Sequence, residues 1–219
     1  MSRRAVRTVA IDGPAGAGKS TLARSLAERL GLERLDTGAM YRSVAWAALE
    51  AGVDPSDAAA VVQLAQRMRI DMGDDGRVVV DDTDVTTAIR TPAVDASVSA
   101  VAAIPAVRAE MVRRQREWVD EHGGGVVEGR DIGTVVLPDA DVKVYLTAGS
   151  HERARRRATE RGVSDLAEVA RAIDHRDSLD STRLVSPLPD PRSVASDAIV
   201  VDSTGKEAEQ VLAEVLTCL

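Results

Sequence analysis

The sequence predicts an α/β fold in which helices cover both faces of a parallel sheet, and two observations support this. Short apolar runs, typical of strands buried on both faces, alternate with longer segments whose apolar residues recur at helical spacing. The first run, residues 7–12, stops at a glycine-rich turn, and a helical pattern follows from residue 20 to residue 30. Strand, loop and helix in this order are typical of the first unit of a parallel sheet.

The predicted core elements continue this alternation along the chain. Its strands are predicted at residues 7–12, 33–36, 126–128, 141–147 and 198–201. Its helices are predicted at residues 20–30, 38–51, 105–121, 150–161 and 164–178, with a last helix opened by residues 204–207.

Residues with special backbone or capping chemistry set the ends of these helices. Gly31 and Gly52 close the first two helices, and Pro105 suits the first turn of the third. Ser164 is predicted to cap the N-terminus of the helix that follows it. Thr204-Gly-Lys-Glu207 matches a capping box and is predicted to open the last helix.

The segment from residue 53 to residue 104 differs from the rest of the chain. A helix follows Asp54-Pro55, and strand patterns at residues 69–72 and 77–80 flank a Gly-Asp-Asp-Gly hairpin turn. We interpret residues 53–104 as an insertion into a core formed by residues 1–52 and 105–219.

Composition restricts the possible partners. The 219 residues carry a formal net charge of -7, which argues against a nucleic-acid polymer as the main partner because phosphate-backbone binding needs clustered positive charge. The single cysteine, Cys218, excludes a disulfide framework, the three histidines show no metal-ligand spacing, and no apolar run approaches the roughly 20 residues of a membrane span. We therefore expect a cytoplasmic protein with neither a structural metal nor a membrane segment.

One motif points to chemistry. Residues 13–20 satisfy G-x-x-x-x-G-K-[ST] between a strand and a helix, which is the context of a phosphate-binding P-loop. Its backbone N–H groups would surround the phosphates of ATP, Lys19 would bridge the β- and γ-phosphates, and Ser20 would reach Mg²⁺. The predicted ATP-binding residues are Gly13, Pro14, Ala15, Gly16, Ala17, Gly18, Lys19, Ser20 and Thr21.

The loop does not identify the phosphoryl acceptor, because GTPases, motors and small-molecule kinases share it. A regulatory GTPase should carry an N-K-x-D motif, and none of the three lysines follows an asparagine.

Three further segments, residues 36–42 (DTGAMYR), 129–134 (GRDIGT) and 176–183 (RDSLDSTR), stand in that order behind the P-loop. With it they closely resemble bacterial cytidylate kinase, a nucleoside-monophosphate kinase, over nearly the whole chain.

This resemblance implies a five-stranded parallel P-loop core, an inserted monophosphate-binding domain and a short lid at residues 150–163. It also implies ATP and CMP or dCMP as substrates, with Mg²⁺. Arg42, Arg130 and Arg183 would bind the acceptor phosphate, and Asp180 would contact the sugar. Asp36 and Thr37, inside the first segment, join the predicted substrate-binding set.

The resemblance further implies that Ser99, Arg108 and Asp131 read the base. The chemistry of cytosine agrees, because its N4 amino group can donate to a carboxylate or hydroxyl while an arginine donates to N3 and O2. Two alternatives stay open: Asp131 could support Mg²⁺ through water, and Ser99 lies in a segment that also reads as a plain small-residue helix.

The lid helix concentrates arginines at positions 153, 155, 156, 157 and 161, which would close over the triphosphate and exclude water. Helical spacing favours Arg153 and Arg157, one turn apart, over Arg155 as phosphate contacts. The predicted catalytic residues are Lys19, Arg130, Asp131, Arg157 and Arg176. No general base is required, since a monophosphate oxygen is already an anionic nucleophile.

The function expected is transfer of the γ-phosphoryl group of ATP to CMP or dCMP by a monomeric enzyme. A kinase of another nucleoside monophosphate or small metabolite is the alternative. A non-catalytic, nucleotide-dependent regulatory module is a third hypothesis, and the arginines expected near the acceptor disfavour it.

Overall fold

A computed structural model describes residues 6–73, 75–182, 185, 187–190, 194 and 196–219, and of Arg161 the backbone alone. The chain forms two compact units, one of residues 1–34 and 122–219 and the other of residues 35–121. The second unit extends beyond the predicted insertion, residues 53–104, at both ends. It takes in the helices on either side of that segment because they pack against helices within it.

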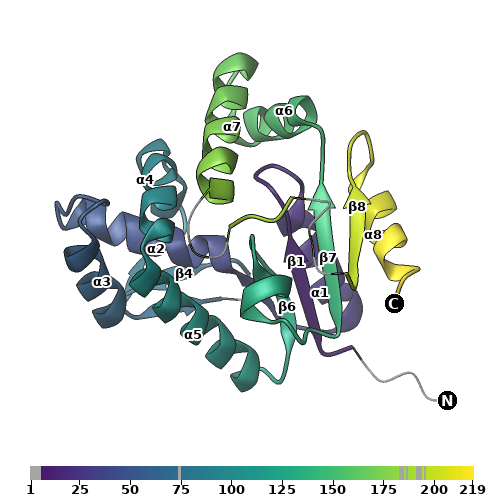
Figure 1. Cartoon of the computed structure of the whole chain (residues 1–219), viewed down its shortest axis with the longest axis horizontal. Helices are drawn as coiled ribbons and strands as arrows, with labels where there is room; N and C mark the ends of the chain where they lie inside the picture. Colours follow the sequence, from purple (N-terminus) through teal and green to yellow (C-terminus); the bar gives the residue numbers. More distant parts are fainter. Residues whose placement is uncertain (1–5, 74, 183–184, 186, 191–193, 195) are drawn as a thin grey trace. The chain divides into compact units, whose positions relative to one another are not determined.

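The first unit is built on a five-stranded parallel sheet with the strand order β2-β6-β1-β7-β8. The strands are β1 (Thr8–Asp12), β2 (Arg34–Asp36), β6 (Gly125–Glu128), β7 (Val142–Thr147) and β8 (Ala198–Asp202), and the unit boundary falls within β2. Figure 1 shows β1, β6 and β7 running side by side, and the register sets Ile11 opposite both Glu128 and Val144. The carboxyl ends of these strands therefore meet at one edge of the sheet, where open α/β folds bind ligands.

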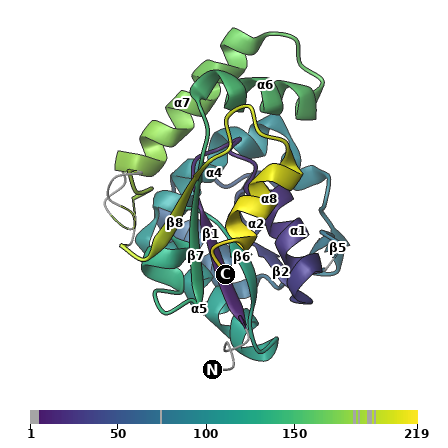
Figure 2. The same cartoon turned by 90° about the vertical axis from the view of Figure 1, so that its right-hand side faces the viewer.

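Helices flank this sheet, and the predicted α/β fold is confirmed. The helices α1 (Lys19–Leu30) and α8 (Ala208–Leu216) lie together beside the sheet in Figure 2. They share one apolar cluster with the strands, in which Ile11, Leu26 and Val215 are fully buried. Removing such side chains from water is the main favourable contribution to folding.

The remaining helices of this unit are α6 (Ser150–Arg161) and α7 (Leu166–Thr182), which pack on one another above the sheet (Figures 1 and 2). Small side chains of α6, Ala154 and Ala158, meet Val169 and Ile173 of α7 in a separate apolar cluster. Because alanine side chains are short, the two helices can approach closely.

Two predicted helix caps are wrong. Asp165, not Ser164, caps α7, because its carboxylate accepts the Glu168 N–H at 2.9 Å. The last helix is opened by a capping box of Glu207 and Gln210, while the hydroxyl of Thr204 donates to Asp202 at 2.6 Å. In both cases a nearby side chain with the better geometry takes the role that the sequence pattern assigned to its neighbour.

The second unit combines four helices with a small antiparallel sheet. The helices are α2 (Thr37–Glu50), α3 (Ala58–Arg67), α4 (Pro92–Ala103) and α5 (Pro105–Glu121). The sheet contains the predicted hairpin of β3 (Ile70–Met72) and β4 (Val78–Val80), and adds β5 (Thr83–Asp84). The 3-10 turn η1 (Ala88–Arg90) follows it in the chain. The helix α2 packs on α3, α4 and η1, and α5 packs on α3 and α4.

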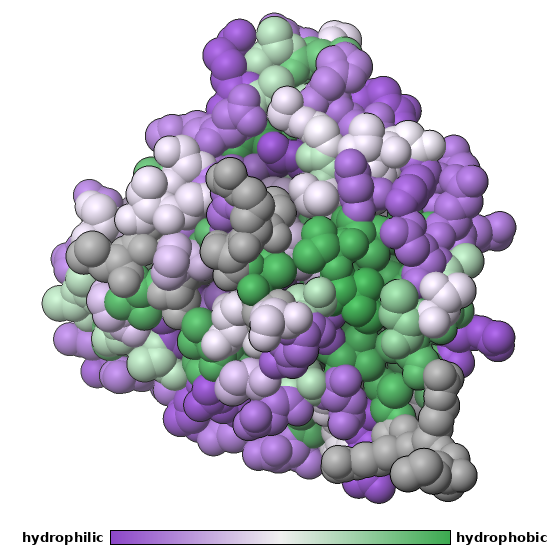
Figure 3. Space-filling view, turned by 45° about the vertical axis from the view of Figure 1, so that its right-hand side comes forward, coloured by the Kyte–Doolittle hydropathy of each residue, from purple (hydrophilic) through white to green (hydrophobic). Residues whose placement is uncertain are grey.

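The surface in Figure 3 is mainly hydrophilic, with apolar areas between the polar ones. The large apolar side chains that the described residues expose are Leu49, Val163, Leu166, Leu179, Val185 and Val200. In the part of the chain that the structure describes, no helix has both the length and the apolar character needed to cross a bilayer.

Candidate active site

The P-loop joins β1 to α1 at the carboxyl edge of the sheet, and its backbone needs glycine. Gly13 has a φ of 146°, and a Cβ there would lie 2.0 Å from the Leu146 carbonyl oxygen of β7. Gly18, also with a positive φ, stands at the N-cap of α1, so the loop leads directly into a helix N-terminus. This end of a helix presents backbone N–H groups and a positive dipole to an anion.

Lys19 lies over the loop that precedes it. Its Nζ donates to the carbonyl oxygens of Gly13 at 2.8 Å and Pro14 at 2.9 Å. Burial and the neighbouring charge of Arg130 lower the pKa of Lys19. A phosphate anion beside this ammonium group would favour its charged form, so the site is chemically suited to an anionic ligand.

A second buried charge supports the loop after β6. Asp12, the last residue of β1, accepts the backbone N–H groups of Ile132 at 2.6 Å and Gly133 at 2.8 Å. These N–H groups belong to a single π-helical turn, η2 (Ile132–Val136). Burial raises the pKa of Asp12 to about 6, with a further rise from Asp131, although the two hydrogen bonds act in the opposite direction. Asp12 thus ties the start of the P-loop to the Gly129–Thr134 segment.

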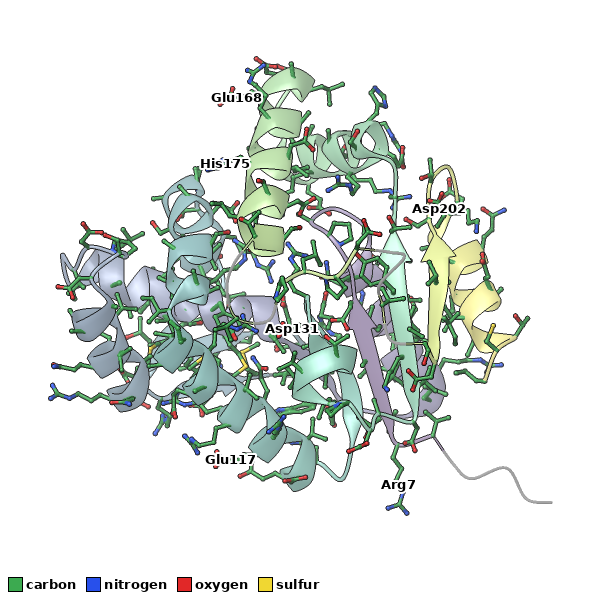
Figure 4. The ribbon with its side chains drawn as sticks, viewed as in Figure 1. Arg7, Glu117, Asp131, Glu168, His175 and Asp202 are labelled. Atoms are coloured by element: carbon green, nitrogen blue, oxygen red, sulfur yellow. The ribbon has the colours of Figure 1, made fainter. Side chains whose placement is uncertain are left out.

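Several predicted acceptor residues meet the P-loop. Arg130 donates through Nε to Asp180 at 2.9 Å and through Nη1 to the Gly13 carbonyl oxygen at 2.7 Å. Arg176 lies 4.0 Å from the same Asp180 carboxylate. Asp131 is buried beyond the carboxyl end of β6, where Figure 4 labels it. The structure therefore brings Arg130, Arg176 and Asp180 together, whereas Arg183 falls outside the described residues.

Ser20 has a carboxylate neighbour that the sequence did not single out. Its hydroxyl donates to Glu128 at 2.8 Å, and Glu128 also pairs with Arg34 at 3.6 Å. Hydroxyl and carboxylate oxygens are hard ligands that suit Mg²⁺. Among the described residues no group of three or more His, Cys, Asp and Glu side chains could hold a metal.

The arginines of α6 divide into two groups. Arg153, only 9% exposed, donates to the Ala15 carbonyl oxygen at 3.1 Å, and Arg156 approaches the Ala17 carbonyl oxygen at 3.3 Å. Arg155 pairs instead with Glu152 at 2.7 Å, and Arg157 pairs with Glu160 at 3.2 Å. Arg153, which helical spacing selected, contacts the loop, and so does Arg156, which it did not select.

A cavity of about 310 Å³ opens beside the P-loop. It is lined by Gly16, Ala17, Gly18, Thr21, Leu22, Leu146, Glu152, Arg155, Arg156, Thr159, Glu160, Ser203, Lys206, Glu207, Ala208 and Val211. Ser203 organises one wall, because its hydroxyl donates to the Ala17 carbonyl oxygen at 2.9 Å and accepts from Arg156 at 2.9 Å. A cavity that combines apolar side chains, here Leu22, Leu146 and Val211, with a few fixed polar groups is typical of a small-molecule site.

The other predicted substrate residues belong to the second unit. Asp36 caps α2 by accepting the Ala39 N–H at 3.1 Å, and Thr37 is the first residue of that helix. Arg42 forms an ion pair with Asp95 and donates to the Ile89 carbonyl oxygen at 3.4 Å.

The two base-reading candidates of this unit are Ser99 and Arg108. Both are buried, on α4 and α5, and the Arg108 guanidinium lies 5.6 Å from the ring centroid of Tyr41. Charged and polar groups are costly to bury without partners, so their burial requires specific neighbours or a ligand.

Comparison with known proteins identifies the family. Residues 9–219 match the family model for cytidylate kinase. The chain belongs to the cytidylate kinase family. The cytidylate kinase of Mycobacterium avium is 52% identical over 93% of this chain and 91% of its own length, and that of Limosilactobacillus reuteri is 48% identical over 94% and 92%. The predicted resemblance is confirmed.

More distant solved structures agree with the fold of this cytidylate kinase family member. A gluconokinase from Sinorhizobium meliloti superposes with a TM-score of 0.54 at 14% identity, covering 98% of this chain and 92% of the gluconokinase. At that identity the likeness shows the fold alone.

Three residues around the loop escaped the sequence interpretation: Asp12, Glu128 and Asp177. Asp12 and Glu128 end strands that flank the loop, and the end of a parallel strand was the signal that could have found them. Asp177 lies within a motif segment, but its contact with the P-loop depends on how α7 folds back over the loop.

Proposed function

We propose that this chain transfers the γ-phosphoryl group of ATP to CMP or dCMP, giving ADP and CDP or dCDP, with Mg²⁺. The observation that carries the proposal is the meeting of Lys19, Arg130 and Asp180 at the P-loop in a chain of the cytidylate kinase family. Donor and acceptor phosphates both need concentrated positive charge, which Lys19 and Arg130 would supply at the loop, while Asp180 holds Arg130 in place.

The donor would bind along the P-loop. Backbone N–H groups and the α1 N-terminus would receive the phosphates, while the nucleoside would enter the cavity lined by Arg156 and Ser203. The four hydrogen bonds that hold Arg156 to Glu152, Ala17 and Ser203 fix its guanidinium plane, which suits a flat aromatic base.

Mg²⁺ would be held by the Ser20 hydroxyl together with oxygens of the donor phosphates, with Glu128 accepting from Ser20 or from bound water. When bound, the ion would neutralise charge that develops on the phosphates during transfer. Asp131 supports either this metal or the base, and a variant distinguishes these roles below.

The acceptor phosphate would be bound by Arg42, Arg130 and Arg183, and its sugar by Asp180. Arg130 is already paired with Asp180 at 2.9 Å, so the acceptor would share an arranged ion pair instead of meeting isolated side chains. Ser99, Arg108 and Asp131 would read the cytosine edge. A site built on such hydrogen bonds rejects an analogue that leaves them unpaired.

Catalysis would then consist of positioning and charge neutralisation. The acceptor oxygen is an anion and needs no base, while Lys19, Arg130, Arg157 and Arg176 would offset charge on the transferring group. The α6–α7 pair would exclude water from the phosphates, favouring transfer over hydrolysis. We also propose that the protein works as a monomer in the cytoplasm, and sedimentation at micromolar concentration tests the monomeric state.

A coupled assay of ADP release with MgATP and equal concentrations of CMP, dCMP, UMP, AMP, GMP and dTMP tests the proposal. We expect high turnover with CMP and dCMP and low turnover with UMP. Asp131→Asn should relax the preference for CMP over UMP if Asp131 reads the base, and should raise the Mg²⁺ requirement instead if it supports the metal. Preference for another acceptor, or nucleotide binding without turnover, would overturn the proposal.

A further inference from the structure

Every group of Ala15, at the tip of the P-loop, has a partner in the α6–α7 pair. Its N–H donates to the Asp177 carboxylate at 3.2 Å, and its carbonyl oxygen accepts from Arg153 at 3.1 Å. Its methyl group packs against the apolar cluster between α6 and α7. A single residue of the phosphate loop is thus held at three points by two helices far from it in the sequence.

The two charged partners of Ala15 also hold each other. Arg153 and Asp177 form an ion pair, and Arg153 is fixed at its other side by the Ala148 carbonyl oxygen at 3.1 Å. The side chains are 10% and 16% exposed, so water screens this pair only weakly. Asp174, one turn before Asp177 and 63% exposed, lies 3.9 Å from the same guanidinium. Asp177 is therefore the buried carboxylate of the two.

The next loop residue shows how closely α6 approaches. A Cβ on Gly16 would lie 2.9 Å from the Arg153 carbonyl oxygen and 3.1 Å from the Arg153 Cβ. Close backbone contact leaves little room for the loop tip to shift independently of α6. The contact is therefore between backbones as well as between side chains.

The contacts that Arg153 and Asp177 make with Ala15 also affect Lys19, through the backbone of the loop. Lys19 donates to the carbonyl oxygens of Gly13 and Pro14, and Pro14 directly precedes Ala15. Because the Ala15 N–H and the Pro14 carbonyl group belong to one planar peptide, holding that N–H fixes the orientation of one of the two carbonyl groups that hold Lys19. Asp177 also contributes to the electrostatic field at both Lys19 and Arg130.

We propose that Asp177 is a positioning residue for phosphoryl transfer: it holds Arg153 and the Ala15 peptide in one arrangement, and through them orients Lys19. This inference rests on the proposed function. Because Lys19 bridges the β- and γ-phosphates, misplacing it affects the transferring group more than the backbone contacts to the remaining phosphates. Displacements near 1 Å at such groups cost up to about a hundredfold in rate.

The test compares Asp177→Asn with Asp174→Asn in the full-length enzyme. Asparagine keeps an oxygen for the Ala15 N–H but loses the charge that holds Arg153. We expect kcat for CMP to fall at least about tenfold in D177N while the dissociation constant for MgADP changes less than about threefold, and D174N to match the wild type. A merely structural role would lower kcat and MgADP affinity together.

Further variants test whether Asp177 acts through its contact with Arg153. Asp177→Glu, which restores the charge, should recover part of kcat. Arg153→Lys keeps the charge but loses the planar guanidinium. The double variant of R153K and D177N should be no slower than the slower of the two single variants, because both substitutions remove the same contact. If D177N is too unstable to purify, the split between kcat and MgADP affinity is measured on R153K.

A D177N enzyme with kcat within twofold of the wild type, or with equal losses of kcat and MgADP affinity, would overturn the inference while leaving the proposed function standing. A wild-type chain that phosphorylates no acceptor would overturn both.

Discussion

Asp12→Asn tests whether burial or hydrogen bonding controls the carboxylate at the end of β1. Burial disfavours the charged form, whereas two backbone N–H bonds of 2.6 and 2.8 Å favour it. The pKa of Asp12 in the folded chain is raised from 3.8 to about 6, so burial outweighs the hydrogen bonds. The variant removes this titration while keeping a side chain of the same shape.

The direction in which stability changes with pH follows from the number of protons that each state binds at Asp12. Between pH 3.8 and about 6 the folded state binds more protons at Asp12 than the unfolded state does. The stabilisation that Asp12 gives is therefore fully present below the unfolded pKa, and it is lost as the pH rises through the folded pKa. Relative to D12N, the wild type should gain about 1 kcal/mol of unfolding free energy between pH 7.5 and pH 5, and about 2 kcal/mol by pH 4.

The assay is urea denaturation of both proteins at each pH, because subtracting the two curves cancels the titration of all other groups. A difference that stays flat across this range, or one in which the wild type loses stability relative to D12N as pH falls, would contradict a raised pKa of Asp12. The second result would mean that the two N–H bonds hold the pKa of Asp12 below its usual value.

Three further changes test the loop, the cavity and the metal. Gly16→Ala places a Cβ 2.9 Å from the Arg153 carbonyl oxygen of α6 at a φ of +74°, whereas Gly31→Ala places one at a φ of +66° with nothing within 4 Å. The first variant should therefore lower the melting temperature more than the second; equal losses would show that backbone strain alone acts. Arg156→Met should raise the KM for ATP several-fold with kcat nearly unchanged, whereas Arg155→Met, at a more exposed site, should change it less. Ser20→Ala should raise the Mg²⁺ concentration needed for half-maximal rate, and an unchanged requirement would exclude the hydroxyl as a ligand.

Local sequence signals predicted most of the fold. The bounds of α5 and α6 agree with the prediction because each begins at a residue suited to a first turn and carries continuous helical sequence up to a glycine or to charged residues. The strand β5 was missed because it has only two residues, and η2 because a single π-turn has no sequence period.

The site was predictable where a motif fixes local geometry and less so where tertiary contacts decide. Lys19 and Ser20 follow from the loop pattern alone. Which arginines of α6 reach the loop depends on the rotation of that helix over α7, which helical spacing does not give. Arg156 was therefore predicted as one of the lid arginines but not singled out. The roles of the buried carboxylates, Asp12 above all, depend on which strand ends meet, which only the sheet order reveals.

The walls of the cavity beside the P-loop come from segments that lie far apart in the sequence, and this has a consequence for synthesis on the ribosome. The P-loop at residues 13–21 is made well before Ser203, which joins Ala17 to Arg156, and before Val211, which also lines the cavity. A nascent chain that has folded its first strand and helix still lacks this side of the pocket. Full retention of the donor nucleotide by a ribosome-bound chain would therefore mark the moment when β8 and α8 have emerged and joined the sheet.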